Sequence, residues 1–270
     1  MNGRQSAAFA AGLALFLIAA TALLPFVLGD LGLRADFSAR NLAPAAAHPF
    51  GTDQMGRDIL ARSLHGLALS LQIGLLAAGI SVALSALMAM ASGLGRRADQ
   101  IAAFVTDGFL AMPHLMLLIL LAFAFGGGTT AVILAVAISH WPRLARILRA
   151  ELLQIRAAPY VETARALGRT RLHITRAHIL PHLLPQMLVG FLLMFPHAIL
   201  HEAALTFLGF GLEPSRPAIG VMLSEAMRHI SAGRWWLALF PGLMLLGLVL
   251  SFEMLGTALR RLLSPRGAQC

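Results

Sequence analysis

Long apolar runs with few charges alternate along the chain with short segments that hold most of its charges. A membrane-spanning helix needs about 20 predominantly apolar residues, so the pattern predicts six membrane-spanning helices. They cover residues 7–28, 67–94, 101–125, 131–141 with an extension to 148, 186–212 and 235–259. The first run follows a basic start but is longer than the core of a signal peptide, so we expect an uncleaved anchor.

The composition agrees with an all-α membrane protein. Hydrophobic residues make up 58% of the 270 residues, charged residues make up only 12%, and the mean hydropathy is +0.78. A soluble domain carries about 25% charged residues, so we expect an integral membrane protein with a single transmembrane domain over residues 1–270. Cys270 is the only cysteine, and the sequence therefore offers neither a disulfide framework nor a cysteine metal site.

The arginines indicate the orientation of the predicted spans. Arginine accounts for all 21 basic residues, and the formal net charge is +9. Six spans place both termini on one side, and the segments on that side hold 14 of the 21 arginines. Because cationic residues favour the cytoplasmic side, both termini and a loop over residues 150–185 are expected there, with outer loops over 29–65 and 213–234. Contact with anionic lipid headgroups explains the positive balance, and we expect no nucleic acid.

Within the cytoplasmic loop, residues 160–185 form a basic, polar stretch that is too charged to lie in lipid. Residues 162–167 are typical of a short helix, which Gly168 ends by taking a left-handed conformation. A second helix is expected over residues 171–180 and should stop before Pro181. Two short helices joined by a glycine form a compact projection that can seat in a groove of another protein. The alternative is a plain basic loop bound to lipid headgroups.

This stretch resembles the EAA motif, the cytoplasmic coupling loop of ABC importer permeases. The family pattern is Glu-Ala-Ala, three residues, Gly, nine residues, Ile, any residue, and Leu-Pro. The matching residues are Glu162, Ala164, Gly168, Leu180 and Pro181. Thr163 replaces the second position, and His178 stands where the isoleucine is expected, with Ile179 beside it. The resemblance implies that the matching residues couple the chain to an ATPase.

Further motifs extend the resemblance over residues 10–266 to the C-type permease of dipeptide, oligopeptide and nickel importers. They are residues 51–62 (GTDQMGRDILAR), 139–141 (SHW), 207–212 (FLGFGL) and 240–242 (FPG). The resemblance implies a type I ABC importer transmembrane domain in the bacterial cytoplasmic (inner) membrane. It also implies a second homologous permease, two ATPase subunits inside and an extracytoplasmic substrate-binding protein. Because the sequence has no Walker A pattern, ATP and Mg²⁺ are expected on the ATPases, and no cofactor is expected on this chain.

The outer motif concentrates charges of both signs in Asp53, Arg57, Asp58 and Arg62. Asp58 and Arg62 are four residues apart and would share one face of a helix. One interpretation is structural, with an ion-pair cluster that fixes the outer loop on the spans. The other is functional, with these side chains docking the substrate-binding protein.

The fifth predicted span carries His197, His201 and Glu202. The two histidines are four residues apart, so their imidazoles would share one helix face. Imidazole and carboxylate are suitable ligands for nickel, cobalt or zinc, and we expect a transient metal site in the substrate path. The alternative is that the two histidines are satisfied by hydrogen bonds between helices.

The resemblance is closest to the nickel-type C permease, which also shows His-x-x-x-His in its fifth span. It therefore implies nickel, or another transition metal carried as a chelate, as the cargo. Di- or oligopeptide import by the same architecture is the alternative. An intramembrane enzyme or channel is a third hypothesis with weaker support. His201 and Glu202 begin like the zinc-protease pattern His-Glu-x-x-His, but Leu205 stands where the second histidine is required. We therefore expect a non-catalytic membrane subunit.

Overall fold

The computed structural model describes residues 3–263, and this part of the chain forms helices and connecting loops without a β-strand. The α-helices are α1 (Gly3–Leu28), α2 (Ile59–Ser92), α3 (Arg96–Ala111), α4 (His114–Ala124), α5 (Gly128–Arg156), α6 (Pro159–Ala166), α7 (Arg171–Ile174), α8 (Leu180–Phe207), α9 (Ile219–Met227) and α10 (Trp236–Leu263). The short segments are the 3-10 helices η1 (Phe37–Ala39) and η3 (Ile230–Ala232) and the π-helix η2 (Thr175–Ile179). The predicted all-helical fold is confirmed. The ends of the chain, including Cys270, lie outside the described residues.

Five helical segments are long and apolar enough to cross a membrane: α1, α2, α5, the continuous run from α7 through α8, and α10. α3 and α4 together make a sixth, but they meet at an angle of 99°. The predicted span over 101–125 is therefore formed by two helices that meet at a bend. The break lies at Met112 and Pro113, because proline restrains the residue before it to extended backbone. Met112 accordingly has φ −80° and ψ 140°.

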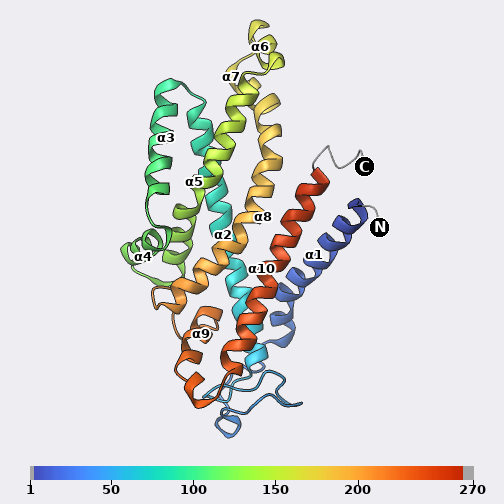
Figure 1. Ribbon diagram of the computed structural model, residues 1–270, viewed down its shortest axis with the longest axis vertical. Helices are drawn as coiled ribbons and strands as arrows, with labels where there is room; N and C mark the ends of the chain where they lie inside the picture. The colour runs from blue at the N-terminus through green and yellow to red at the C-terminus, as the bar shows by residue number, and fades with distance from the viewer. Residues whose placement is uncertain (1–2, 264–270) are drawn as a thin grey trace.

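The helices run between the two ends of an elongated molecule (Figure 1). One end carries α6 and α7, and the opposite end carries α9 and the loop between α1 and α2. α1 begins and α10 ends in the half of the molecule that carries α6 and α7. The loop over residues 150–185 thus lies toward the same end as the first and last described helical turns, as a six-span topology requires.

α2 is the central helix and packs against both α5 and α8. Its contact with α5 is close because small residues line it. Ser81 of α2 donates a hydrogen bond to the carbonyl oxygen of Ala137 at 2.7 Å, and Ser85 donates one to that of Trp141 at 2.8 Å. Small and hydroxyl-bearing residues let helix backbones approach where no water drives association. These bonds fix α5, which leads into the cytoplasmic loop, against the centre of the fold.

Ion pairs hold α3 beside α5. The Arg149 guanidinium donates two hydrogen bonds to the carboxylate of Asp99, at 2.6 and 2.7 Å. Arg146 donates another to Asp107 at 2.7 Å. Both contacts lie before the bend at Pro113, so α3 stays fixed to α5 up to the point where the chain turns into α4.

The predicted helix stop before Pro181 is wrong, because the helix continues from α7 through η2 into α8. In the π-helix η2, the N–H of Leu180 donates to the carbonyl oxygen of Thr175. A proline inside an α-helix clashes with the carbonyl group four residues earlier, and a π-turn widens the backbone at that place. The widened turn admits Pro181 at the start of α8, so the cytoplasmic loop and the following span form one continuous helical segment.

Candidate functional site

The cytoplasmic loop is anchored to the spans by one apolar face. Val161 and Ala164 of α6 and Ile174 of α7 are buried. They belong to a core cluster that also contains Leu148 and Leu152 of α5. This packing fixes α6 and α7 on the ends of the long helices, so a force on the loop is transmitted to α5 and α8.

Gly168 ends α6 as predicted. Its φ is +76°, in the left-handed region that glycine adopts without steric cost. The N–H of Gly168 donates to the Arg165 carbonyl oxygen at 2.9 Å, and the N–H of Arg169 donates to that of Ala164 at 3.1 Å. These bonds satisfy carbonyl groups that the helix end leaves without partners. Thr170 then caps α7 by accepting a hydrogen bond from the N–H of His173 at 3.2 Å.

The other face of the loop is exposed and partly apolar. Leu167 is 76% exposed and Leu172 is 68% exposed, although both are large hydrophobic residues. Glu162 and Pro181 of the predicted coupling set are also exposed, whereas Ala164 is buried and Leu180 is partly buried. The structure thus divides the predicted coupling residues between an inner face that packs on the spans and an outer face that is open to a partner.

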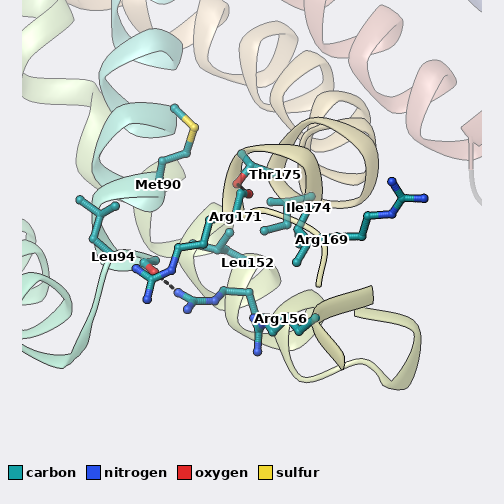
Figure 2. Close-up of a pocket in the computed structure, with 11 residues that line it drawn as sticks. Met90, Leu94, Leu152, Arg156, Arg169, Arg171, Ile174 and Thr175 are labelled. Carbon is teal, nitrogen blue, oxygen red and sulfur yellow. Dashed lines mark hydrogen bonds between the residues drawn. The ribbon is translucent and has the colours of Figure 1, made fainter. Parts of the chain in front are cut away.

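A cavity of about 530 Å³ lies beside this loop, between the end of α2 and the turns of α6 and α7 (Figure 2). Its basic lining residues are Arg156, Arg165, Arg169 and Arg171. Figure 2 shows Arg156 and Arg171 extending to the same side of the cavity, while Arg169 points away. The Arg156 guanidinium donates a hydrogen bond to the Gly93 carbonyl oxygen, which ties the end of α5 to the end of α2. The sequence indicated the basic character of this region but not the cavity.

The outer charged residues form a buried network that Asp53 organises. Asp53 is 1% exposed, and its carboxylate accepts hydrogen bonds from the Arg57 Nε at 2.7 Å and the Arg62 Nη1 at 2.6 Å. Arg62 also donates to Glu225 of α9 at 3.1 Å. No sequence pattern pointed to Glu225, because more than 160 residues separate it from Arg62. The network joins the outer loop, α2 and α9.

The predicted pairing of Asp58 with Arg62 is not observed. Asp58 is the N-cap of α2 and accepts a hydrogen bond from the N–H of Ala61 at 3.0 Å. Its second oxygen lies 2.9 Å from the Nδ1 of His48. α2 therefore begins at Ile59, ahead of the predicted start at residue 67, since Arg62 is neutralised by Asp53 and can lie within the helix.

The three residues of the predicted substrate path have different surroundings. The side chain of His197 is exposed, and its backbone carbonyl accepts a hydrogen bond from the Nδ1 of His201 at 2.6 Å. Glu202 is fully buried and accepts hydrogen bonds from Ser70 of α2 at 2.6 Å and from Thr206 at 3.1 Å. Glu202 thus joins α8 to α2 and does not lie beside the imidazole of His197.

His201 instead lies beside two histidines that sequence reasoning did not select, His114 of α4 and His140 of α5. One possible ligand nitrogen from each of the three lies within 4.8 Å of the others. His197 is not a member of this group. The only sequence signal was the presence of histidine inside apolar segments, because the three helices that contribute them are distant along the chain.

An all-helical molecule with several apolar spans is typical of a multi-pass membrane protein. The family model for the binding-protein-dependent transport system inner membrane component matches residues 75–266. The chain belongs to this family. It is therefore a permease subunit of an ABC importer in the inner membrane, and it is a non-catalytic subunit.

Curated relatives cover almost the whole chain. A putative peptide transport system permease protein of Brucella suis is 37% identical over 96% of this chain and 88% of the relative. The dipeptide transport system permease protein DppC of Bacillus subtilis is 32% identical over 93% of this chain and 79% of the relative. The glutathione transport system permease protein GsiD of Pectobacterium atrosepticum is 34% identical over 97% and 88%.

Two solved transporters share the fold. The methionine ABC transporter MetNI in an inward-facing conformation aligns with a TM-score of 0.61 and 18% identity, over 76% of this chain and 96% of that chain. An amino acid ABC transporter crystallised with histidines aligns with a TM-score of 0.59 and 21% identity, over 76% and 95%. At these identities the likeness establishes the type I importer fold alone.

Proposed function

We propose that this chain is a permease subunit of an ABC importer for di- or oligopeptides. The support is the set of relatives named above, which are described as peptide, dipeptide and glutathione permeases and align over nearly the full length of this chain. Nickel import, the cargo expected from the His197 and His201 spacing, has less support. The relatives named above carry no metal in their descriptions, and His197 is not among the three histidines whose nitrogens lie within 4.8 Å of one another.

The observation that carries the coupling part of the proposal is the two-faced packing of α6 and α7. An ATPase subunit docks on the exposed face, which includes Glu162, Leu167 and Leu172. Closure of the ATPase moves the loop as a unit, because its inner face is packed in the same core as α5. The movement reaches the membrane directly, since α7, η2 and α8 are one continuous helical run from Arg171 to Phe207.

The remaining subunits follow from the family. Two ATPase subunits bind ATP and Mg²⁺, a second homologous permease completes the pathway, and an extracytoplasmic binding protein delivers the peptide. Helices in lipid must keep their backbone hydrogen bonds satisfied throughout the cycle. The spans therefore move as rigid bodies.

For the outer network we propose a structural role. Asp53 and Arg62 are almost fully buried and satisfy each other, so neither carries a charge that a docking protein can reach. Asp58 and Arg57 are likewise engaged, as an N-cap and in an ion pair. The binding protein then contacts the outer surface that this network holds in shape.

The cargo is tested on the assembled complex, with its ATPases, second permease and binding protein reconstituted in lipid vesicles. ATP hydrolysis that depends on the binding protein should rise when di- or tripeptides are added and should not rise with Ni²⁺. The control is the same complex without the binding protein, whose hydrolysis should not respond to peptide. A response to Ni²⁺ with none to peptides would contradict peptide import and leave the permease assignment intact.

A further inference from the structure

Three imidazole rings from three helices meet at one place in the fold. His114 is the first residue of α4, His140 lies in α5 and His201 in α8. The ring centroids are 4.7 Å apart for His114 and His140, 4.6 Å for His114 and His201, and 5.0 Å for His140 and His201. The interplanar angles lie between 77° and 81°, so the rings converge edge to face and do not stack in parallel.

Backbone carbonyl groups determine which nitrogen of two rings is free. The Nδ1 of His140 lies 2.8 Å from the Val136 carbonyl oxygen, and the Nδ1 of His201 lies 2.6 Å from that of His197. A carbonyl oxygen only accepts, so each Nδ1 carries the proton and each Nε2 keeps a lone pair. A hydrogen bond of this kind on one ring nitrogen commonly orients the other nitrogen of a metal-ligating histidine.

The free nitrogen of His140 lacks a partner. Its Nε2 is buried and makes no hydrogen bond to any described residue. A buried polar atom without a partner is costly, and most such atoms in folded proteins are satisfied. This nitrogen lies in a group with two further imidazoles. A single ligand that accepts an electron pair from each of the three rings would satisfy it.

A divalent transition-metal ion fits this donor set. Neutral imidazole suits zinc, copper, nickel and related ions, and a set of three histidines leaves one position open for water or another ligand. A tetrahedral ion with bonds of about 2.0–2.1 Å separates its ligand nitrogens by about 3.4 Å. The nitrogens here lie within 4.8 Å of one another, a difference that small side-chain rotations can close.

The charges near the three rings show what would balance a bound ion. The charged and titratable groups whose electrostatic influence reaches the three rings are Arg143 and His197. Neither is an anion, and Glu202 is directed away into its bonds with Ser70 and Thr206. The ion's two positive charges therefore have no carboxylate to balance them.

We propose that His114, His140 and His201 form a binding site for one divalent transition-metal ion. The ion would join α4 to α5 and α8 and so fix the bent pair of α3 and α4 against the helix that leads to the coupling loop. The site differs from the predicted His197 and His201 pair in two of its three ligands. The proposed metal site does not depend on which cargo is imported, because a peptide importer can hold such an ion as a structural group.

Co²⁺ is the probe, because its visible absorption reports nitrogen coordination. The assembled complex is stripped with a chelator and titrated with Co²⁺, and Zn²⁺ is then added to displace it. We expect one equivalent of Co²⁺ per copy of this chain that is absent from the H114A/H140A/H201A triple variant. Loss of an outer partner of a ligand costs about 10–100-fold in metal affinity, and loss of a ligand in H140A or H201A should cost at least as much.

His197→Ala is the matched control, since His197 lies one turn from His201 and outside the cluster. It should bind Co²⁺ with unchanged affinity and the same spectrum. Assembly and ATP hydrolysis of each variant verify its folding, and H114A, which alters the partly exposed start of α4, serves if H140A does not assemble. The proposal is overturned if the triple variant binds as much Co²⁺ as the wild type. It is equally overturned if H197A weakens binding as much as H201A does.

Discussion

The side chains at the two ends of the molecule are arranged in opposite ways. At the outer end, Asp53 and Arg62 are almost completely buried and find their partners within the chain. At the cytoplasmic end, Leu167 and Leu172 are exposed on a projection whose inner face is packed. The outer network is satisfied internally, while the coupling loop presents a surface that the chain itself leaves uncovered.

This difference separates side chains that stabilise the fold from side chains that are available to a partner. A buried charge that loses its partner destabilises the fold, because the remaining charge stays desolvated. An exposed side chain contributes little to the stability of its own chain and can be changed without unfolding it. Substitutions at the outer end should therefore change stability first, and substitutions at the cytoplasmic end should change coupling first.

The largest effect on stability is expected for Arg62→Ala. It leaves the Asp53 carboxylate with Arg57 as its remaining charged partner and removes the contact to Glu225. Breaking a buried pair costs about 3–5 kcal/mol, and we expect the lower end because Arg57 remains. The free energy of unfolding in detergent micelles measures it. The control is Arg34→Ala, whose exposed contact to Asp30 is worth about 0–1 kcal/mol. Equal losses in the two variants would refute the difference between buried and exposed pairs.

Gly168→Val should have an intermediate effect on stability and a large one on coupling. Valine in the left-handed region at φ +76° costs about 1–2 kcal/mol, and relief of that strain displaces α7 relative to α6. ATP hydrolysis by the assembled complex should then lose its dependence on the binding protein. Gly168→Asn is the matched control, because asparagine tolerates this conformation and the position has open space around it. Normal coupling in the valine variant would show that the loop geometry is not needed.

Leu172→Asp should leave stability almost unchanged and weaken coupling. The side chain is 68% exposed, and exposed substitutions usually change stability by less than about 0.5 kcal/mol. A charge on the docking face disfavours contact with an apolar surface of the ATPase. Retention of the ATPases on the purified permease pair measures the effect. Leu172→Met, which keeps the apolar character, is the control and should retain the ATPases fully. Full retention by the aspartate variant would place the docking face elsewhere.

The smallest effect is expected at the outer loop, where hydrogen bonds from the Ser38 hydroxyl and backbone N–H hold the pKa of Asp36 below its ordinary value. A lowered pKa in the folded state means that the contribution to stability is present above the unfolded pKa and is lost as the pH falls through the folded pKa. Ser38→Ala should therefore lower the unfolding temperature slightly at neutral pH, and the difference from the wild type should vanish in acid. If the difference in unfolding temperature grew in acid, the hydrogen bonds from Ser38 would not be stabilising the ionised form of Asp36, and the prediction would be wrong.

Much of the fold follows from local chemistry. The apolar runs predicted the spans, and the glycine in the loop predicted the left-handed end of α6, because both depend on a few consecutive residues. The same local rules failed where another part of the chain intervened. Pro181 was expected to stop a helix, but a π-turn accommodates it. Arg62 was expected to lie in a loop, but Asp53 neutralises it inside α2.

The candidate sites also differ in whether consecutive residues or distant parts of the chain form them. Glu162, Gly168 and Pro181 were selected as coupling residues through the resemblance to the EAA motif, which the sequence shows because the loop is contiguous. The histidine cluster was not, because spacing along one helix favoured His197 as the partner of His201. Whether an imidazole meets another depends on how α4, α5 and α8 rotate about their axes when they pack.

The sequence by itself determined that this is a helical membrane protein and where most of its apolar segments lie, and it showed which loop resembles the EAA motif. Hydropathy, the arginine distribution and the backbone preferences of glycine act along the chain, so they can be read from it. Only the tertiary structure decided that Glu225 completes the outer network, that α3 and α4 meet at 99°, and that His114, His140 and His201 converge. These features depend on contacts between helices distant in sequence, and the packing of side chains across helix faces selects them.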